Sequence, residues 1–125
     1  MADLYKEDLP DQCPPAESQE IRANMHVFRL IETAQPKDND FLSQRASNPD
    51  AVFGVDECIA RGVSVWVQQA DVARLKKIPK FRNAKVCRVN LHDGAGKIIQ
   101  TFDPNHRTWW PFAAFSILTQ CEVLG

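Results

Sequence analysis

The pattern that most constrains the fold is the alternation Val63-Ser64-Val65-Trp66-Val67. Valines occupy every second position, so in an extended chain they share one face while Ser64 and Trp66 share the other. A helical pattern follows from Gln69 to Ile78, with apolar residues on one side and Pro79 at its end. This order predicts a strand that leads into an amphipathic helix.

Three further segments have the composition of strands. Met25 to Ile31 is rich in β-branched and aromatic residues. Lys85 to Leu91 and Lys97 to Thr101 flank His92 to Gly96, whose Asp-Gly step is typical of a hairpin turn. Phe112 to Val123 predicts a last strand.

Between these segments the chain is irregular from 40 to 55, and Asp56 is expected to cap a brief helix that Gly62 ends. The predicted fold class is α+β, a single domain with a mainly antiparallel sheet of four to five strands and one main helix packed on it. A chain of 125 residues is long enough to bury one core of this kind.

The first 20 residues differ from the rest in composition. They hold six acidic residues against Lys6 alone, and three prolines. We therefore expect residues 1–20 to form a mobile acidic arm and residues 21–125 to form the domain. The start of the chain lacks the pattern of a secretory signal, and the longest near-apolar run, Trp109 to Leu118, is far shorter than the roughly 20 residues that span a bilayer. The expectation is a cytoplasmic protein without a membrane segment.

The four cysteines, Cys13, Cys58, Cys87 and Cys121, are widely spaced and form no C-x-x-C pair. We expect reduced, partly buried thiols and no metal site, with disulfides as a less favoured alternative that the even count supports.

Charge is unevenly distributed along the chain. Between residues 61 and 88, Asp71 is the only acidic residue against eight basic ones, seven of which lie between 74 and 88. This cluster is interpreted as a solvated face, a surface covered by the acidic arm, a protein interface or a phosphate-binding surface. Its members are Arg74, Lys76, Lys77, Lys80, Arg82, Lys85 and Arg88.

The segment from Asn105 to Pro111 is a second candidate binding site and is expected to form a loop. In it, His106 and Arg107 precede Trp109 and Trp110. Indole faces stack on planar rings while His and Arg contact oxygens, so such a loop suits a small-ligand pocket. The alternative is structural, with both tryptophans closing the end of the sheet and the imidazole holding the loop. His26, His92 and His106, together with Arg29, Arg45 and Arg107, also have the chemistry of a metal-independent ribonuclease.

Two resemblances add to this interpretation. Arg29, Ser64 and Gln120-Cys121-Glu122 resemble the Arg, Ser and Q-x-E trio of one branch of the ADP-ribosyltransferases. The resemblance implies that Glu122 orients the nicotinamide ribose of NAD and that Arg29 contacts its phosphates.

The segments 40–45, 58–66 and 106–110 resemble a family of small uncharacterised bacterial proteins. This second resemblance implies a bacterial source and points to Arg45, Ser64, His106 and Trp109.

The first expectation for function is a non-catalytic binding module of a bacterial protein. It would contact a partner protein or a small ligand through Arg45, His106, Arg107, Trp109 and Trp110 without a cofactor. The alternative is an ADP-ribosyltransferase-like or nucleotide-handling enzyme that uses NAD and the residues Arg29, Ser64 and Glu122. The third is a small RNA-binding or RNA-cleaving protein. The sequence leaves the oligomeric state and the question of catalysis open.

Overall fold

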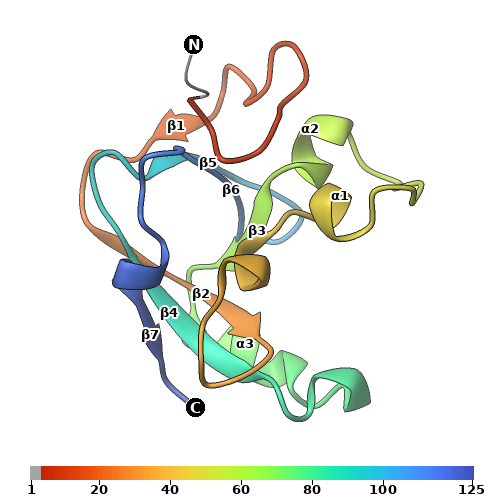
Figure 1. The fold of residues 1–125 in the computed structure, drawn as a ribbon, viewed down its shortest axis with the longest axis vertical. Coiled ribbons are helices and arrows are strands. Elements are labelled where there is room, and N and C mark those ends of the chain that lie inside the picture. The colour runs from red at the N-terminus through yellow and green to blue at the C-terminus, as the bar shows by residue number, and fades with distance from the viewer. Residues whose placement is uncertain (1–3) are drawn as a thin grey trace.

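The computed structural model describes residues 4–125 and confirms an α+β fold built on one antiparallel sheet (Figure 1). The sheet has seven strands in the order β1-β5-β6-β3-β2-β4-β7, and the helices α1, α2 and α3 are short. The prediction of four to five strands and one main helix is therefore too simple. The strands are β1 (Gln19–Glu20), β2 (Met25–Ile31), β3 (Val63–Trp66), β4 (Lys85–Leu91), β5 (Gly96–Gln100), β6 (His106–Pro111) and β7 (Cys121–Val123).

Strands β4 and β5 follow one another in the chain but do not form the predicted hairpin. β4 pairs with β2 and β7, whereas β5 pairs with β1 and β6. Three strands lie between them, which in a flat sheet would separate them by about 19 Å. The Ala95 N–H donates to the His92 carbonyl at 2.9 Å, so the link is a tight turn that cannot span such a gap. The sheet must therefore curl, as Figure 1 shows.

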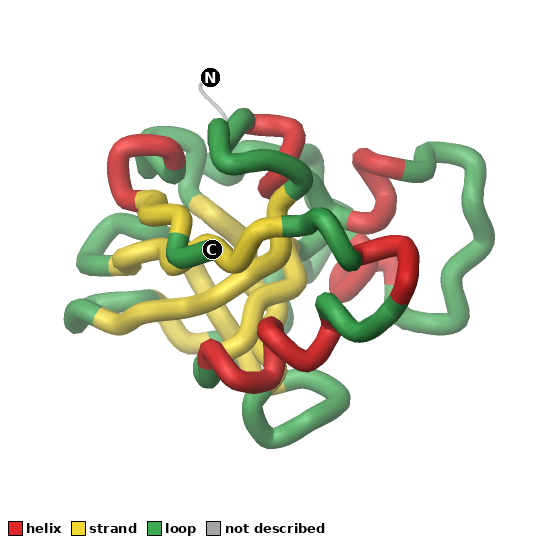
Figure 2. Tube along the Cα trace, turned by 90° about the horizontal axis from the view of Figure 1, so that it is seen from below, coloured by secondary structure: helices red, strands yellow, loops and turns green. Residues whose placement is uncertain are grey.

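The apolar core comes from alternate residues of the central strands. Val27 lies opposite Val89, and Val63 lies opposite Trp109, all fully buried. Phe115 and Ile117, from the segment after β6, add to the same cluster. Figure 2 shows the strands gathered at the centre with helices and loops around them.

Gly96 is required where β5 meets β6. Its φ is 131°, and an added Cβ would lie 2.2 Å from the Trp110 carbonyl oxygen. Only glycine fits such a close backbone approach at a positive φ.

The helix after β3 ends earlier than its periodicity predicts. α3 spans Gln69–Leu75, and Ile78 is extended, with ψ of 127°. Pro79 disfavours helical geometry at the residue before it and begins a 3-10 turn, Pro79–Phe81. The amphipathic face still forms, because Val72 is fully buried.

Two short helices carry the chain from β2 to β3. α1 (Gln44–Ser47) is capped by the Ser43 side chain, and α2 (Glu57–Ala60) is capped by Asp56, as predicted. Gly62 follows α2, but its role is close approach: an added Cβ would lie 2.2 Å from Thr108 Cγ2.

The segment after β5 departs from the predicted loop and strand. His106 to Pro111 is strand β6, not a loop, and pairs on both sides with β3 and β5. The last strand shrinks to Cys121–Val123, because Phe112 to Ile117 turns back over the core.

Contacts hold the described part of the acidic arm along its length. Tyr5 forms a bridge to Phe112, and the Glu7 carboxylate accepts hydrogen bonds from Ser43 N at 2.9 Å and Oγ at 2.5 Å. Gln19 and Glu20 pair with β5 as strand β1. The first three residues lie outside the described part.

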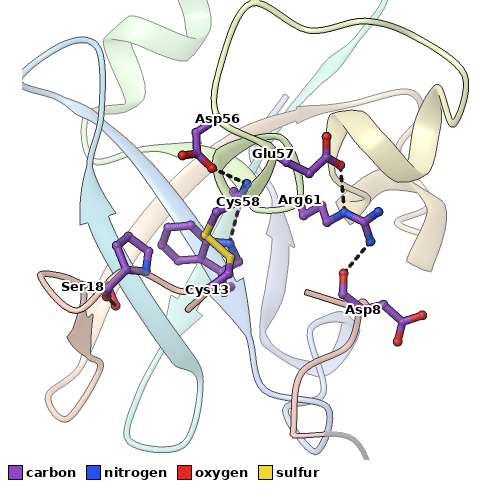
Figure 3. Close-up of a disulfide and its surroundings, with 9 residues drawn as sticks. Asp8, Cys13, Ser18, Asp56, Glu57, Cys58 and Arg61 are labelled. Carbon is purple, nitrogen blue, oxygen red and sulfur yellow. Dashed lines mark hydrogen bonds and ion pairs between the residues drawn. A yellow bond between two sulfur atoms is a disulfide. The ribbon is translucent and has the colours of Figure 1, made fainter. Parts of the chain in front are cut away.

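All four cysteines are paired, so the expectation of separate thiols is wrong. Cys13 joins the arm to Cys58 in α2, with the Cα atoms 5.6 Å apart (Figure 3). Cys87 in β4 pairs with Cys121 in β7. Wide sequence spacing hid both bridges, because each joins two segments that only the tertiary fold brings together.

Within residues 4–125, no helix has both the length and the apolar composition needed to cross a membrane.

Replacing both Cys13 and Cys58 with alanine should lower the free energy of unfolding by about 3 to 4 kcal/mol in oxidising buffer. The bridge closes a loop across 45 residues, and its loss restores conformational entropy to the unfolded chain. Urea unfolding measures the difference, which should disappear when both proteins are reduced. Equal stability under oxidising conditions would contradict this role.

Candidate active site

A small cavity of about 80 Å³ lies over one face of β3 and β6, beneath the chain between Leu42 and Gly62. Ser64 and Trp66 on β3 lie opposite Thr108 and His106 on β6, so the pleat presents all four side chains on the same face. The cavity is lined by Arg29, Leu42, Gln44, Val55, Ile59, Gly62, Ser64, Phe102, His106 and Thr108.

A chain of hydrogen bonds crosses this face. Ser64 Oγ is hydrogen-bonded to His106 Nε2, and His106 Nδ1 lies 2.9 Å from Thr101 Oγ1. Thr101 Oγ1 also bonds Thr108 Oγ1 at 2.8 Å. Hydroxyl, imidazole and threonine are therefore held in fixed relative positions.

The Thr101 carbonyl determines which nitrogen of His106 carries the proton. His106 Nδ1 lies 3.2 Å from this oxygen, which can only accept. We therefore assign the hydrogen to Nδ1, which leaves Nε2 free to accept the Ser64 hydroxyl proton. Burial lowers the pKa of His106, and the bond to Thr101 opposes this only in part. A neutral imidazole in this tautomer is a general base facing a serine.

Arg29 provides the positive charge of the site. β2 and β3 pair at Phe28 and Trp66, and beyond this pair Arg29 Nη1 donates to the Ser64 carbonyl at 2.7 Å. Nε donates to the Asp40 carbonyl at 2.8 Å and Nη2 to the Leu42 carbonyl at 3.3 Å. Burial lowers the pKa of Arg29, while the carboxylates of Asp40 and Glu7 raise it in part.

No carboxylate within the described range 4–125 lies within 4.0 Å of the Arg29 guanidinium. An arginine remains charged at physiological pH. A desolvated cation without a close anionic partner favours a negatively charged ligand.

Arg29 also lies where three cavities meet. Besides the small cavity, Arg29 and Ser64 line one of about 210 Å³ together with Trp66 and Phe81. Arg29 and Phe81 line a third of about 560 Å³, which Lys37 and Lys80 also line. We call this set of neighbouring cavities, which share Arg29 as a lining residue, the Arg29 cleft; the largest of them is within the size range of small-molecule sites.

The other residues expected in a binding loop do not face this cleft. Trp109 and Trp110 are fully buried, and their indole N–H groups donate to the carbonyls of Ala95 and Cys58. Arg107 Nη1 donates to the Pro104 carbonyl at 2.7 Å. Of the residues expected to bind in that segment, only His106 lines the small cavity, and the structure brings it together with Arg29 and Ser64.

Arg45 is bound within the covering segment. Its guanidinium makes two bonds to the Glu57 carboxylate, at 2.8 and 2.9 Å, and Nη1 donates to the carbonyls of Pro49 and Ala51. Glu57 also accepts from Arg61, and the two arginines lower the pKa of Glu57 to about 2. This network fixes the loop that closes the small cavity.

Glu122 lies away from the residues that the transferase resemblance places beside it. It sits on β7 at the edge of the sheet, opposite Arg88 on β4, and pairs with that arginine. Arg29 on β2 bonds the Ser64 carbonyl on β3, and the side chain bonded to the Ser64 hydroxyl is His106 rather than Glu122.

The basic cluster is spread over α3, the turn after it and β4. Arg74 pairs with Asp71, Arg88 pairs with Glu122, and Lys76 Nζ donates to the Gly125 carbonyl at 3.1 Å. Lys77 and Arg82 are exposed, Lys85 is half-buried, and Lys80 lies over the Phe81 ring, 4.9 Å from its centroid. Lys80 therefore belongs to the Arg29 cleft as well as to the cluster.

The sequence analysis did not identify three side chains of the candidate site. Thr101 orients His106, and Trp66 and Lys37 line the cleft. The alternation of β3 placed Trp66 on the Ser64 face, which was a usable signal. No pattern linked Thr101 or Lys37 to the site.

Replacing Arg45 with alanine should raise the pKa of Glu57 from about 2 toward the ordinary 4.5, because the bond from Arg45 contributes most to the shift. An NMR titration of the Glu57 carboxyl carbon measures it. Arg107→Ala is the control and should leave this pKa unchanged. A Glu57 pKa that stays near 2 in Arg45→Ala would show that Arg61 alone sets it.

The free energy of unfolding should fall as pH drops below about 6.5. The pKa of His106 is lower in the folded chain than its ordinary 6.5, so the unfolded chain binds more protons in this range. The contribution of His106 to the free energy of unfolding is fully present above pH 6.5. It is lost as the pH falls toward the pKa of His106 in the folded chain. Urea unfolding at several pH values gives the free energy of unfolding as a function of pH. Between these pH values, that free energy should change less in His106→Gln than in the control His92→Gln. An identical pH dependence of the free energy of unfolding in both variants would refute this role of His106.

The site thus consists of a half-buried serine bonded to a buried histidine, beside the guanidinium of Arg29. Within residues 4–125, no three His, Cys, Asp or Glu side chains group as metal ligands. Comparisons of the chain with protein-family models, with curated proteins and with solved structures give no match.

Proposed function

We propose that the protein is a nucleotide-handling enzyme and that the Arg29 cleft binds a phosphate-bearing nucleotide. The observation that carries this proposal is the guanidinium of Arg29, which is partly buried, has no carboxylate within 4.0 Å among residues 4–125, and lines three cavities. A planar guanidinium suits phosphate oxygens, which it can bind in pairs.

The donors of Arg29 are only partly used by the protein. Its three hydrogen bonds to backbone carbonyls engage three of its five N–H groups. The other two are available to a phosphate, while the bonded three hold the plane of the guanidinium in place. A preorganised donor loses little conformational entropy when the ligand binds.

The middle of the cleft supports binding of a base. Trp66 and Phe81 line the 210 Å³ cavity with Leu30 and Leu75. Aromatic rings next to aliphatic side chains provide a surface on which a planar base stacks. Lys80, beside Phe81, adds positive charge at the wider end, where Glu32 and Asp40 also lie.

The two disulfides favour an oxidising compartment over the predicted cytoplasmic location. Contact with a partner protein and binding of RNA by the basic cluster stay predictions.

Titration with NAD, ADP and AMP should stabilise the protein, with a gain of about 2.7 kcal/mol at a ligand concentration one hundred times the dissociation constant. Arg29→Lys should weaken binding at least tenfold, because an ammonium cannot reproduce the planar pair of donors. Lys80→Ala should weaken it a few-fold, while the matched control Lys77→Ala, whose lysine lies outside the cleft, should not.

Isothermal titration calorimetry gives the dissociation constants, and circular dichroism checks that each variant is folded. The proposed site would be refuted if none of the three nucleotides binds. It would also be refuted if Arg29→Lys and Lys80→Ala both bind with the same affinity as the parent protein.

A further inference from the structure

Ser64 has the surroundings of an activated nucleophile. Its hydroxyl bonds His106 Nε2, the other nitrogen of that ring is held by Thr101, and Arg29 bonds the Ser64 carbonyl. These are the three parts that nucleophilic catalysis requires: a nucleophile on a base, a base oriented by a further group, and a cation near the reacting atom.

We propose that Ser64 is a nucleophile that attacks a phosphoryl group bound at Arg29, with His106 as its general base. This inference rests on the proposed function, since the nucleotide in the Arg29 cleft supplies the phosphoryl group. The substrate class is a nucleotide phosphodiester or phosphoanhydride.

The reaction proceeds in two balanced steps. Ser64 Oγ forms a bond to phosphorus while its proton moves to His106 Nε2, and the bond from phosphorus to the leaving oxygen breaks. The leaving oxygen takes the proton from His106 Nε2. Water then attacks the phosphoserine, gives a proton to the same nitrogen, and the Ser64–phosphorus bond breaks as Ser64 recovers its proton.

The surroundings of Ser64 favour phosphoryl transfer over acyl transfer. Ser64 stands within β3, paired with Thr108, so its backbone belongs to the sheet ladder and does not form a loop or helix N-terminus that would bind an oxyanion. Negative charge near Oγ is instead stabilised by the guanidinium of Arg29. Such a group binds the oxygens of a phosphoryl transition state.

Access to Ser64 is open from the cleft. The residue lines both the 80 Å³ and the 210 Å³ cavities, so a phosphoryl group bound at Arg29 can approach from the side of Trp66. His106 is only 6% exposed, which keeps the base away from bulk water.

Treatment with a small alkyl fluorophosphonate tests the nucleophile directly, because attack expels fluoride and leaves a stable phosphonate ester. Peptide mapping by mass spectrometry should find the adduct on Ser64. The rate should rise with pH through the lowered pKa of His106 and then level off. Ser64→Ala should abolish this adduct, and the control Ser116→Ala, at an exposed serine, should keep it.

Loss of the base should slow labelling by 100-fold or more in His106→Gln. Thr101→Val, which keeps the carbonyl and removes only the hydroxyl, should shift the pH profile of labelling with a smaller loss of rate. Both variants are compared at equal folded fraction, measured by circular dichroism. If His106→Gln labels as fast as the parent, or the adduct forms only on other serines, the proposal is wrong.

The two proposals fail in different ways. Binding of ADP or NAD without labelling of Ser64 would overturn the nucleophile and keep the nucleotide site. Labelling of Ser64 without binding of any nucleotide would overturn the proposed ligand class and keep the serine–histidine pair.

Discussion

The structure depends on the curl that a short connection imposes on the sheet. Four residues join β4 to β5, yet three strands separate these two in the sheet order. A flat sheet cannot satisfy both facts, so the strands wrap around Val27, Val65, Val89 and Trp109. Once the sheet curls, the opposite face of β3 and β6 is left for polar residues. The chain between β2 and β3 then covers that face and encloses the small cavity.

Arg29 holds this arrangement together where backbone pairing of β2 and β3 gives way. Its guanidinium reaches carbonyls on β3 and on the segment that follows β2, so one side chain fixes the strand, the covering loop and the cavity floor. The Glu7 carboxylate reinforces the same loop through Ser43, which links the acidic arm to the site. Local geometry at the site therefore depends on contacts from three distant parts of the chain.

Much of the local structure was predictable because it rests on short-range chemistry. The bounds of β2 and β4, the cap at Asp56 and the alternation of β3 followed from periodicity and capping. Long-range pairing was not predictable. The Asp-Gly turn was correctly found, yet its two strands bind different neighbours, since partner choice depends on the curl of the whole sheet.

The candidate site was only half visible in the sequence for the same reason. Arg29, Ser64 and His106 were named two at a time in different hypotheses, but no hypothesis combined all three, because their convergence depends on the order of β2, β3 and β6. The same order carries Glu122 to an edge strand and buries Trp109. Residue type therefore identified which side chains could bind or react. The order of the strands determined which of those side chains lie together in one site.

Arg29 has more charge than its structural role needs. Three backbone carbonyls are neutral acceptors, and an amide or a hydroxyl could satisfy some of them without the desolvation that a guanidinium suffers. A fold that places a cation here, with no carboxylate within 4.0 Å among residues 4–125, keeps a positive potential directed at the Ser64–His106 pair. The same potential disfavours a protonated His106, which helps to keep the imidazole neutral. In the proposed reaction, a fixed cation beside a neutral base would stabilise the negative charge that develops between them, a requirement that stability alone does not impose.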